Sequence, residues 1–162
     1  MNVKKISWVA LFIALSVIGG MIKVPGPVSS IALDSFPALL AAGLLGAGPG
    51  ALVGAFGHLI SALIGGLPMG PLHLLVAAEM AVVVWLFGKM YGSGKRILAV
   101  LVFVLLNGLA APAPFILVMG WPFYAGAAPA ITIAAVFNGI VAAVLLPRVL
   151  PVFEKRFGRV HA

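Results

Sequence analysis

Apolar residues along this chain occur in runs that are separated by prolines, glycines and short polar segments. Each run is long enough to form a helix, and together the runs predict six helices. We place these helices at residues 6–21, 36–46, 49–64, 70–88, 97 to about 112, and 128–146. Residues 118–129 are predicted to form a loop, and Pro147 and Pro151 are predicted to precede a basic tail.

The second apolar run is too short to cross a membrane as a helix. At 1.5 Å per residue, residues 36–46 cover roughly 16 Å, about half of the ~30 Å hydrocarbon layer. Irregular backbone survives at membrane depth only where protein covers it or where it lines a cavity. Pro25, Gly26 and Pro27 break the first helix, and Asp34 and Ser35 are candidate N-caps of the second. We therefore expect the segment between the first two helices to dip over a pocket and cap it.

Small residues recur on one face of the third predicted helix. Gly50, Gly54 and Gly57 form a stripe of the kind that lets helices approach closely in lipid. We expect this helix to pack closely against its neighbours.

The composition identifies the class of protein. The 162 residues are 64% hydrophobic and 8% charged, and the mean hydropathy is +1.26. A soluble domain with this composition would lack the polar groups to cover its surface. We predict an all-α integral membrane protein with one domain, residues 1–162.

The basic residues predict the orientation of the six helices. The formal net charge is +7, but the basic residues lie between apolar runs and form no patch with interleaved aromatics, so we expect no nucleic-acid partner. Nine of the ten fall on one side of a six-helix topology, and only Lys23 falls on the other. The nine are Lys4, Lys5, Lys89, Lys95, Arg96, Arg148, Lys155, Arg156 and Arg159. Both termini are therefore predicted to be cytoplasmic in a multi-pass cell-membrane protein, with the loop between helices 1 and 2 outside.

Four polar residues fall at one level inside the predicted membrane spans. His58, Glu79, Asn107 and Asn138 each lie roughly 12 to 15 Å along their helices from a membrane face. Hydrogen bonding between helices is the simpler explanation for either asparagine alone. A carboxyl group in a span is by default a functional residue, so Glu79 is the stronger candidate. His73 lies nearer the outer end, where contact with water also explains it.

An aromatic cluster occupies the predicted loop before the last helix. Trp121, Phe123 and Tyr124 suit an aromatic belt at the outer membrane interface. As a cluster facing the loop around Asp34, they are also suited to stack on a planar ring and close a pocket.

Motifs for catalysis are mostly missing from the sequence. The chain has no cysteine and three acidic residues, which gives metal-dependent chemistry too few ligands. Residues 92–95, GSGK, resemble a phosphate-binding loop, but Lys89 and Arg96 occupy positions that require Gly and Ser or Thr. We predict that the chain is not an enzyme and uses no metal or cofactor.

The order of these features resembles a known family. A capping first loop, Ala10-x-x-x-Ala14 in the first helix, and the segment from Asp34 to Glu79 with GALVGAFGHLISALIGGLPMGPLHLL are similar to the substrate-binding (S) component of energy-coupling factor (ECF) vitamin transporters. The resemblance covers nearly the whole chain. It implies that Ala10 and Ala14 dock on a coupling transmembrane subunit, which two ATPase subunits drive.

The resemblance also implies a vitamin or vitamin precursor bound in the outer half of the bundle. Lys23 is the only predicted outer cation, so biotin, folate and pantothenate, whose carboxylates need a cation, are less favoured. The best match is to members assigned to α-ribazole, the benzimidazole nucleoside precursor of cobalamin, and the rivals are riboflavin, thiamine and pyridoxine. A membrane interaction protein without a ligand and a proton-coupled carrier that works alone are the other open functions. The candidate ligand-binding residues are Asp34, His58, His73, Glu79, Asn107, Trp121, Phe123, Tyr124 and Asn138.

Overall fold

The computed structural model describes residues 3–25 and 30–157. The first half contains α1 (Val3–Met21), β1 (Lys23–Pro25), β2 (Ser30–Ala32), α2 (Phe36–Leu45) and α3 (Ala47–Ile64). The second half contains a 3-10 turn (Gly70–Leu72), α4 (His73–Gly92), α5 (Arg96–Leu105), a π-helical turn (Leu106–Ala110), a 3-10 turn (Ala113–Phe115), α6 (Ile116–Met119) and α7 (Trp121–Phe157).

The predicted all-α membrane fold is confirmed in the described residues. Five helical stretches are long and apolar enough to cross a membrane, namely Val3–Met21, Ala47–Ile64, Gly70–Gly92, Arg96–Met119 and Trp121–Phe157. The sixth helix, α2, has only 10 residues and agrees with the predicted short run within one residue.

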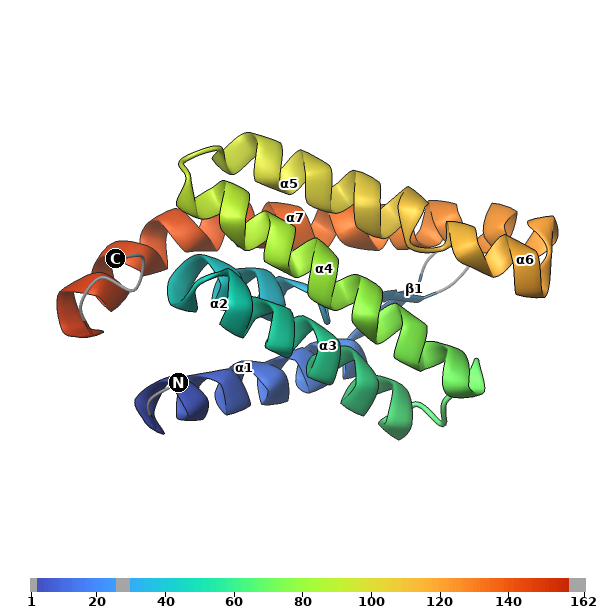
Figure 1. Cartoon of the computed structure of the whole chain (residues 1–162), viewed down its shortest axis with the longest axis horizontal. Helices are drawn as coiled ribbons and strands as arrows, with labels where there is room; N and C mark the ends of the chain where they lie inside the picture. The colour runs from blue at the N-terminus through green and yellow to red at the C-terminus, as the bar shows by residue number, and fades with distance from the viewer. Residues whose placement is uncertain (1–2, 26–29, 158–162) are drawn as a thin grey trace.

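The two termini of the described chain lie at the same end of the helical bundle (Figure 1). The turn between α4 and α5 lies at that end, whereas the turn between α3 and α4 and helix α6 lie at the opposite end. The basic residues at the start of α1, around the α4–α5 turn and at the end of α7 therefore share one end. This arrangement fits an even number of crossings, and the side of the membrane on which that end lies stays a prediction.

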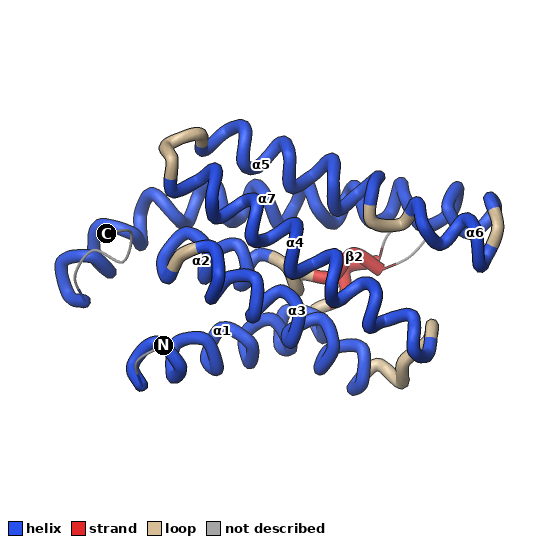
Figure 2. The backbone as a smooth tube through the Cα atoms, in the orientation of Figure 1, coloured by secondary structure: helices blue, strands red, loops and turns tan. Residues whose placement is uncertain are grey.

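The predicted capping segment contains a short antiparallel hairpin. Strand β1 pairs with β2 in the register Lys23 with Ala32, Val24 with Ile31 and Pro25 with Ser30. Figure 2 shows the hairpin between helices within the bundle, and β2 contacts α7 and α1. Gly26 and Pro27 of the predicted helix break lie outside the described residues. Strand pairing satisfies backbone groups that have no helical partner.

Helix α2 forms the centre of the bundle. Its sequence, FPALLAAGLL, is apolar on all sides, which is typical of a helix surrounded by protein. Every residue from Pro37 to Leu45 is buried, and α2 contacts α1, α3, α4 and α7. The short second run is therefore the core helix of the fold.

The small-residue stripe on α3 faces more than one neighbour. A Cβ atom added at Gly57 would lie 2.6 Å from Ser16 Cβ on α1, and one at Gly54 would lie 3.1 Å from the Met80 carbonyl oxygen on α4. Gly50 meets Ala42 of α2 in the same way. These glycines let α3 approach three helices at once, because a side chain at these positions would push the backbones apart.

The last helix is longer than predicted. Residues 118–129 were expected to form a loop, and the helix was expected to span 128–146, but α7 has 37 residues and begins at Trp121. Pro122 is tolerated because the N–H groups of the first helical turn have no intrahelical partner. Pro147 and Pro151 lie inside α7 rather than after it. Both are exposed.

The α-helical pattern after α5 is interrupted before Pro112, where the sequence predicts the kink. Helix α5 ends at Leu105, six residues before Ala111. The Ala111 N–H then donates to the Leu106 carbonyl oxygen at 2.8 Å, which closes a π turn. Pro112 follows and has no N–H to continue the α-helical pattern. The kink expected at Pro112 is thus accommodated by widening the preceding turn.

We expect Gly19→Ala to destabilise the fold by about 2 kcal/mol, the cost of an overpacked core. The Gly19 carbonyl oxygen accepts a hydrogen bond from the Leu33 N–H at 3.1 Å, and a Cβ atom at Gly19 would overlap the Leu33 carbonyl group. Thermal unfolding of the purified protein in detergent measures the effect. Gly48→Ala is the matched control, because a Cβ atom there meets nothing within 4 Å and alanine favours a helix. Equal unfolding midpoints for the two variants would contradict this account.

Candidate functional site

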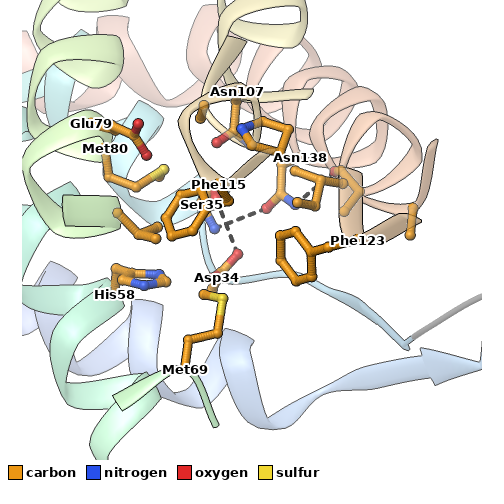
Figure 3. A pocket seen from close by; sticks show the side chains of 16 residues that line it. Asp34, Ser35, His58, Met69, Glu79, Met80, Asn107, Phe115, Phe123 and Asn138 are labelled. Carbon is orange, nitrogen blue, oxygen red and sulfur yellow. Dashed lines mark hydrogen bonds between the residues drawn. The ribbon is translucent and has the colours of Figure 1, made fainter. Parts of the chain in front are cut away.

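A cavity of about 220 Å³ lies between the start of α2, α3, α4, the π turn and α7. Figure 3 shows side chains from these elements pointing toward its centre. Its lining residues are Asp34, Ser35, His58, Met69, Val76, Glu79, Met80, Asn107, Ala111, Pro112, Phe115, Phe123, Ala130, Ile131, Ala134 and Asn138.

Asn138 holds the start of α2 in place. Its side-chain oxygen Oδ1 accepts hydrogen bonds from the Ser35 N–H at 3.1 Å and the Phe36 N–H at 2.7 Å. Its Nδ2 donates to the Ala134 carbonyl oxygen at 2.8 Å, and the residue is 1% exposed. Ser35 makes no side-chain capping bond to α2. A residue from α7 therefore caps this helix.

Asp34 and Ser35 form the floor of the cavity next to that cap. The Ser35 hydroxyl donates to Asp34 Oδ1 at 3.0 Å. Asp34 lies in the loop between β2 and α2, and burial raises the pKa of its carboxyl group while the Ser35 hydrogen bond opposes the shift. This carboxyl group offers hydrogen-bond acceptors to the cavity.

Glu79 presents a carboxyl group with an unused oxygen. Val76, Glu79 and Met80 are three and four residues apart, so α4 directs one face into the cavity. Among the described residues, the buried Oε2 atom of Glu79 has no hydrogen-bond partner. A buried carboxylate oxygen without a donor is costly. This atom is the clearest unmet polar requirement in the cavity.

Asn107 reaches the cavity from the π turn. It is 8% exposed and makes no side-chain hydrogen bond within the described part of the chain. A π turn changes the direction of the side chains that follow it, and such turns are frequent at functional sites. Asn107 thus differs from Asn138, whose polar atoms are all engaged with the protein backbone.

The two histidines form a pair of which only one lines the cavity. His58 Nε2 lies 3.1 Å from His73 Nδ1, and the ring centroids are 5.3 Å apart. His73 is 6% exposed and is not among the residues that line the cavity. The Met69 N–H donates to His73 Nε2 at 3.4 Å.

The three aromatic residues before the last helix are separated by the helix itself. Phe123 lines the cavity, whereas Trp121 is 63% exposed and lines a separate surface groove with Tyr124. The Tyr124 hydroxyl donates to the Leu109 carbonyl oxygen at 3.3 Å. Residues 121 and 124 share one face of α7, and residue 123 points elsewhere. The expected three-ring cluster over the loop around Asp34 is therefore not formed.

Several lining residues were not identified from the sequence. Helical spacing from Glu79 points to Val76, and spacing from Val76 points to Met80. Spacing from Asn138 points to Ala130, Ile131 and Ala134. Met69 and Phe115 lie in or beside turns, where periodicity gives no signal. Their positions depend on how the chain bends at Gly70 (φ +54°) and at the π turn.

The cavity is lined by two acidic residues. Asp34 and Glu79 line it, and no lysine or arginine does among the residues whose side chains the structure describes, which leaves out residues 23–32. No group of three His, Asp or Glu residues in the same part of the chain is arranged to hold a metal ion. The arrangement suits a small organic guest with hydrogen-bond donors better than an anion.

Replacing Asn138 by Ala is expected to cost about 3 kcal/mol of stability, because the Ser35 and Phe36 N–H groups lose their shared acceptor at about 1–3 kcal/mol for a buried unpaired group. Asn138→Asp keeps that acceptor and should lose less. Asn107→Ala is the matched comparison and should change the unfolding temperature little, because Asn107 holds no other residue. Thermal unfolding of the three purified variants is the measurement. Comparable losses for Asn107→Ala and Asn138→Ala would show that the structural roles are not divided in this way.

Comparison with protein families connects this architecture to a class of transporter. Residues 4–152 match the family described as the ECF transporter, substrate-specific component. A search among curated proteins found no match. The family match covers the short core helix and all the elements that surround the cavity. The chain belongs to the substrate-specific components of ECF transporters, which are transport subunits rather than enzymes.

Proposed function

We propose that this chain binds a heteroaromatic vitamin or vitamin precursor in the cavity, with α-ribazole as the first candidate. The observation that carries the proposal is the Glu79 carboxyl group, which lines a largely apolar cavity and whose buried Oε2 atom has no hydrogen-bond partner among the described residues. A ligand hydroxyl or N–H group would satisfy it.

The apolar lining favours a flat ring. Met69, Met80, Phe115 and Phe123 approach the cavity from different sides (Figure 3). Methionine sulfur and aromatic faces both make favourable contacts with ring systems. A ring placed among them would leave the polar groups to set its orientation.

The polar lining favours a ligand that carries hydroxyl groups. The carboxyl groups of Asp34 and Glu79 are acceptors, and the Asn107 amide both donates and accepts. The ribose of a nucleoside supplies matching donors. Carboxylate vitamins are disfavoured because no described lysine or arginine lines the cavity.

Thiamine is the second candidate, and one observation favours it. Asp34 and Glu79 are the only charged residues in the described lining of the cavity, and two carboxyl groups suit a positively charged ring. Riboflavin and pyridoxine are neutral rivals whose ring sizes differ from that of α-ribazole. A binding panel separates these four ligands directly.

We also propose the orientation and partners of the chain. With the basic end of the bundle in the cytoplasm, the cavity lies nearer the outer face of the cell membrane. Ala10 and Ala14 are exposed on the same side of α1, as a surface for close helix packing requires. We assign this face to docking on the coupling transmembrane subunit that works with two ATPase subunits.

Calorimetric titration of the purified chain is expected to give saturable binding of α-ribazole. Glu79→Ala should weaken that binding by roughly ten- to hundredfold, because a ligand donor left buried without its acceptor costs about 1–3 kcal/mol. Thiamine, riboflavin and pyridoxine complete the panel.

Trp121→Ala is the control for this titration, because Trp121 lies outside the cavity and its loss should leave the affinity unchanged. If none of the four compounds binds, the proposed ligand assignment is wrong.

The docking face is tested by enlarging it. Ala10→Trp and Ala14→Trp are expected to prevent co-purification with the coupling subunit and the ATPases, because bulky side chains block close helix approach. Both variants should retain ligand binding. Ala78→Trp, at an exposed position on α4, is the matched control and should still assemble. Assembly of both α1 variants would place the docking surface elsewhere.

A further inference from the structure

The hydrogen bonds around the histidine pair determine where its protons lie. The Met69 N–H is a donor, so His73 Nε2, which lies 3.4 Å away, is the acceptor. A neutral imidazole carries its proton on the other nitrogen, which for His73 is Nδ1. His73 Nδ1–H then donates to His58 Nε2 at 3.1 Å.

The same reasoning extends to the ring that lines the cavity. Because His58 Nε2 accepts, its proton must be on Nδ1. Among the described residues, His58 Nδ1 has no hydrogen-bond partner, whereas both nitrogens of His73 are engaged. The backbone of the α3–α4 turn thus sets the donor pattern of a cavity side chain through one intermediate ring.

We propose that His73 is a positioning residue that holds His58 as the Nδ1–H tautomer, so that this wall of the cavity offers a neutral N–H donor that selects a ligand with an unprotonated ring nitrogen or carbonyl oxygen. This assignment deepens the proposed function and rests on it for the identity of the ligand. The tautomer itself is a property of the empty protein.

Other side chains in the cavity are hydrogen-bond acceptors rather than donors, and this narrows the set of ligands that fit. Asp34 and Glu79 supply acceptors, so ligand hydroxyl groups have partners there, while the acceptor atom of the ring has its partner in His58. A benzimidazole nucleoside carries both, because one ring nitrogen bears the sugar and the other has a free lone pair. An indole nucleoside of the same shape carries C–H at the second position and leaves the His58 donor unpaired, which is costly.

Nitrogen NMR of the ligand-free protein with ¹⁵N-labelled histidine tests the tautomer. The protonated and unprotonated ring nitrogens have well-separated shifts, and the signals are assigned with single histidine variants. Wild-type His58 is expected to be protonated on Nδ1. A wild-type His58 that is protonated on Nε2 would overturn the proposal, whatever the chain binds.

Two substitutions at His73 separate positioning from packing. His73→Phe removes the donor to His58 and should shift His58 toward the Nε2–H tautomer. His73→Asn places an amide nitrogen near the position of Nδ1 and should restore the Nδ1–H form of His58. If His73→Phe leaves the His58 tautomer unchanged, His73 does not position it. Should His73→Phe fail to fold, the wild-type spectrum and His73→Asn still decide the question.

Titration with the two nucleosides tests the consequence for selectivity. The wild-type protein is expected to bind the benzimidazole nucleoside at least tenfold more tightly than its indole counterpart. His58→Phe and His73→Phe should reduce this ratio toward one, and His73→Asn should recover it. Equal wild-type affinities would overturn the selectivity. Absence of binding by both nucleosides would reject α-ribazole as the ligand and leave the tautomer result standing.

Discussion

The fold depends on satisfying the first N–H groups of a helix that begins inside the protein. Helix α2 starts at Phe36, within the bundle, and its first turn has no water to donate to. Asn138 Oδ1 accepts the Ser35 and Phe36 N–H groups, and Asn138 is itself fixed by its bond to Ala134. Because α2 can begin at Phe36, the space in front of its first turn stays open. The cavity occupies that space, and Asp34 and Ser35 are part of its lining.

Polar side chains in this protein divide into two groups by what they contact. Asn138 and Thr132 bond to backbone carbonyl groups, and His73 bonds to His58 and to a backbone N–H. Glu79 Oε2 and Asn107 face the cavity without such partners in the described chain. In an apolar bundle a paired group contributes to the architecture, whereas an unpaired one is retained at a cost. This difference separates the role of Asn107 from that of Asn138, and it cannot be inferred from residue type, because the two have the same side chain.

Sequence patterns predicted the helical fold well because long apolar runs and helix breakers act locally. The shortness of α2 followed from counting residues, and the shared level of His58, Glu79, Asn107 and Asn138 followed from helical rise. All four line the cavity. The predicted start of α7 was wrong because a proline breaks a helix only beyond the first turn, and Pro122 lies within it. The predicted placement of Trp121 and Tyr124 was wrong for the same reason. Pro112 signals the interruption that follows Asn107, but the π turn also packs against Thr132 at Gly108, which is a tertiary contact without a local signal.

Helix α1 connects the floor of the cavity to the exposed face of the bundle. Its Gly19 carbonyl oxygen binds the Leu33 N–H, one residue before Asp34, and Ser16 packs against Gly57 of α3, one residue before His58. The opposite side of the same helix exposes Ala10 and Ala14. One side of α1 therefore contacts elements that carry cavity residues, and the other side presents the proposed docking face. Close packing of Ser16 against Gly57 leaves little free space between α1 and α3. The small residues along α1 and α3 therefore constrain the ligand site and the proposed docking face together.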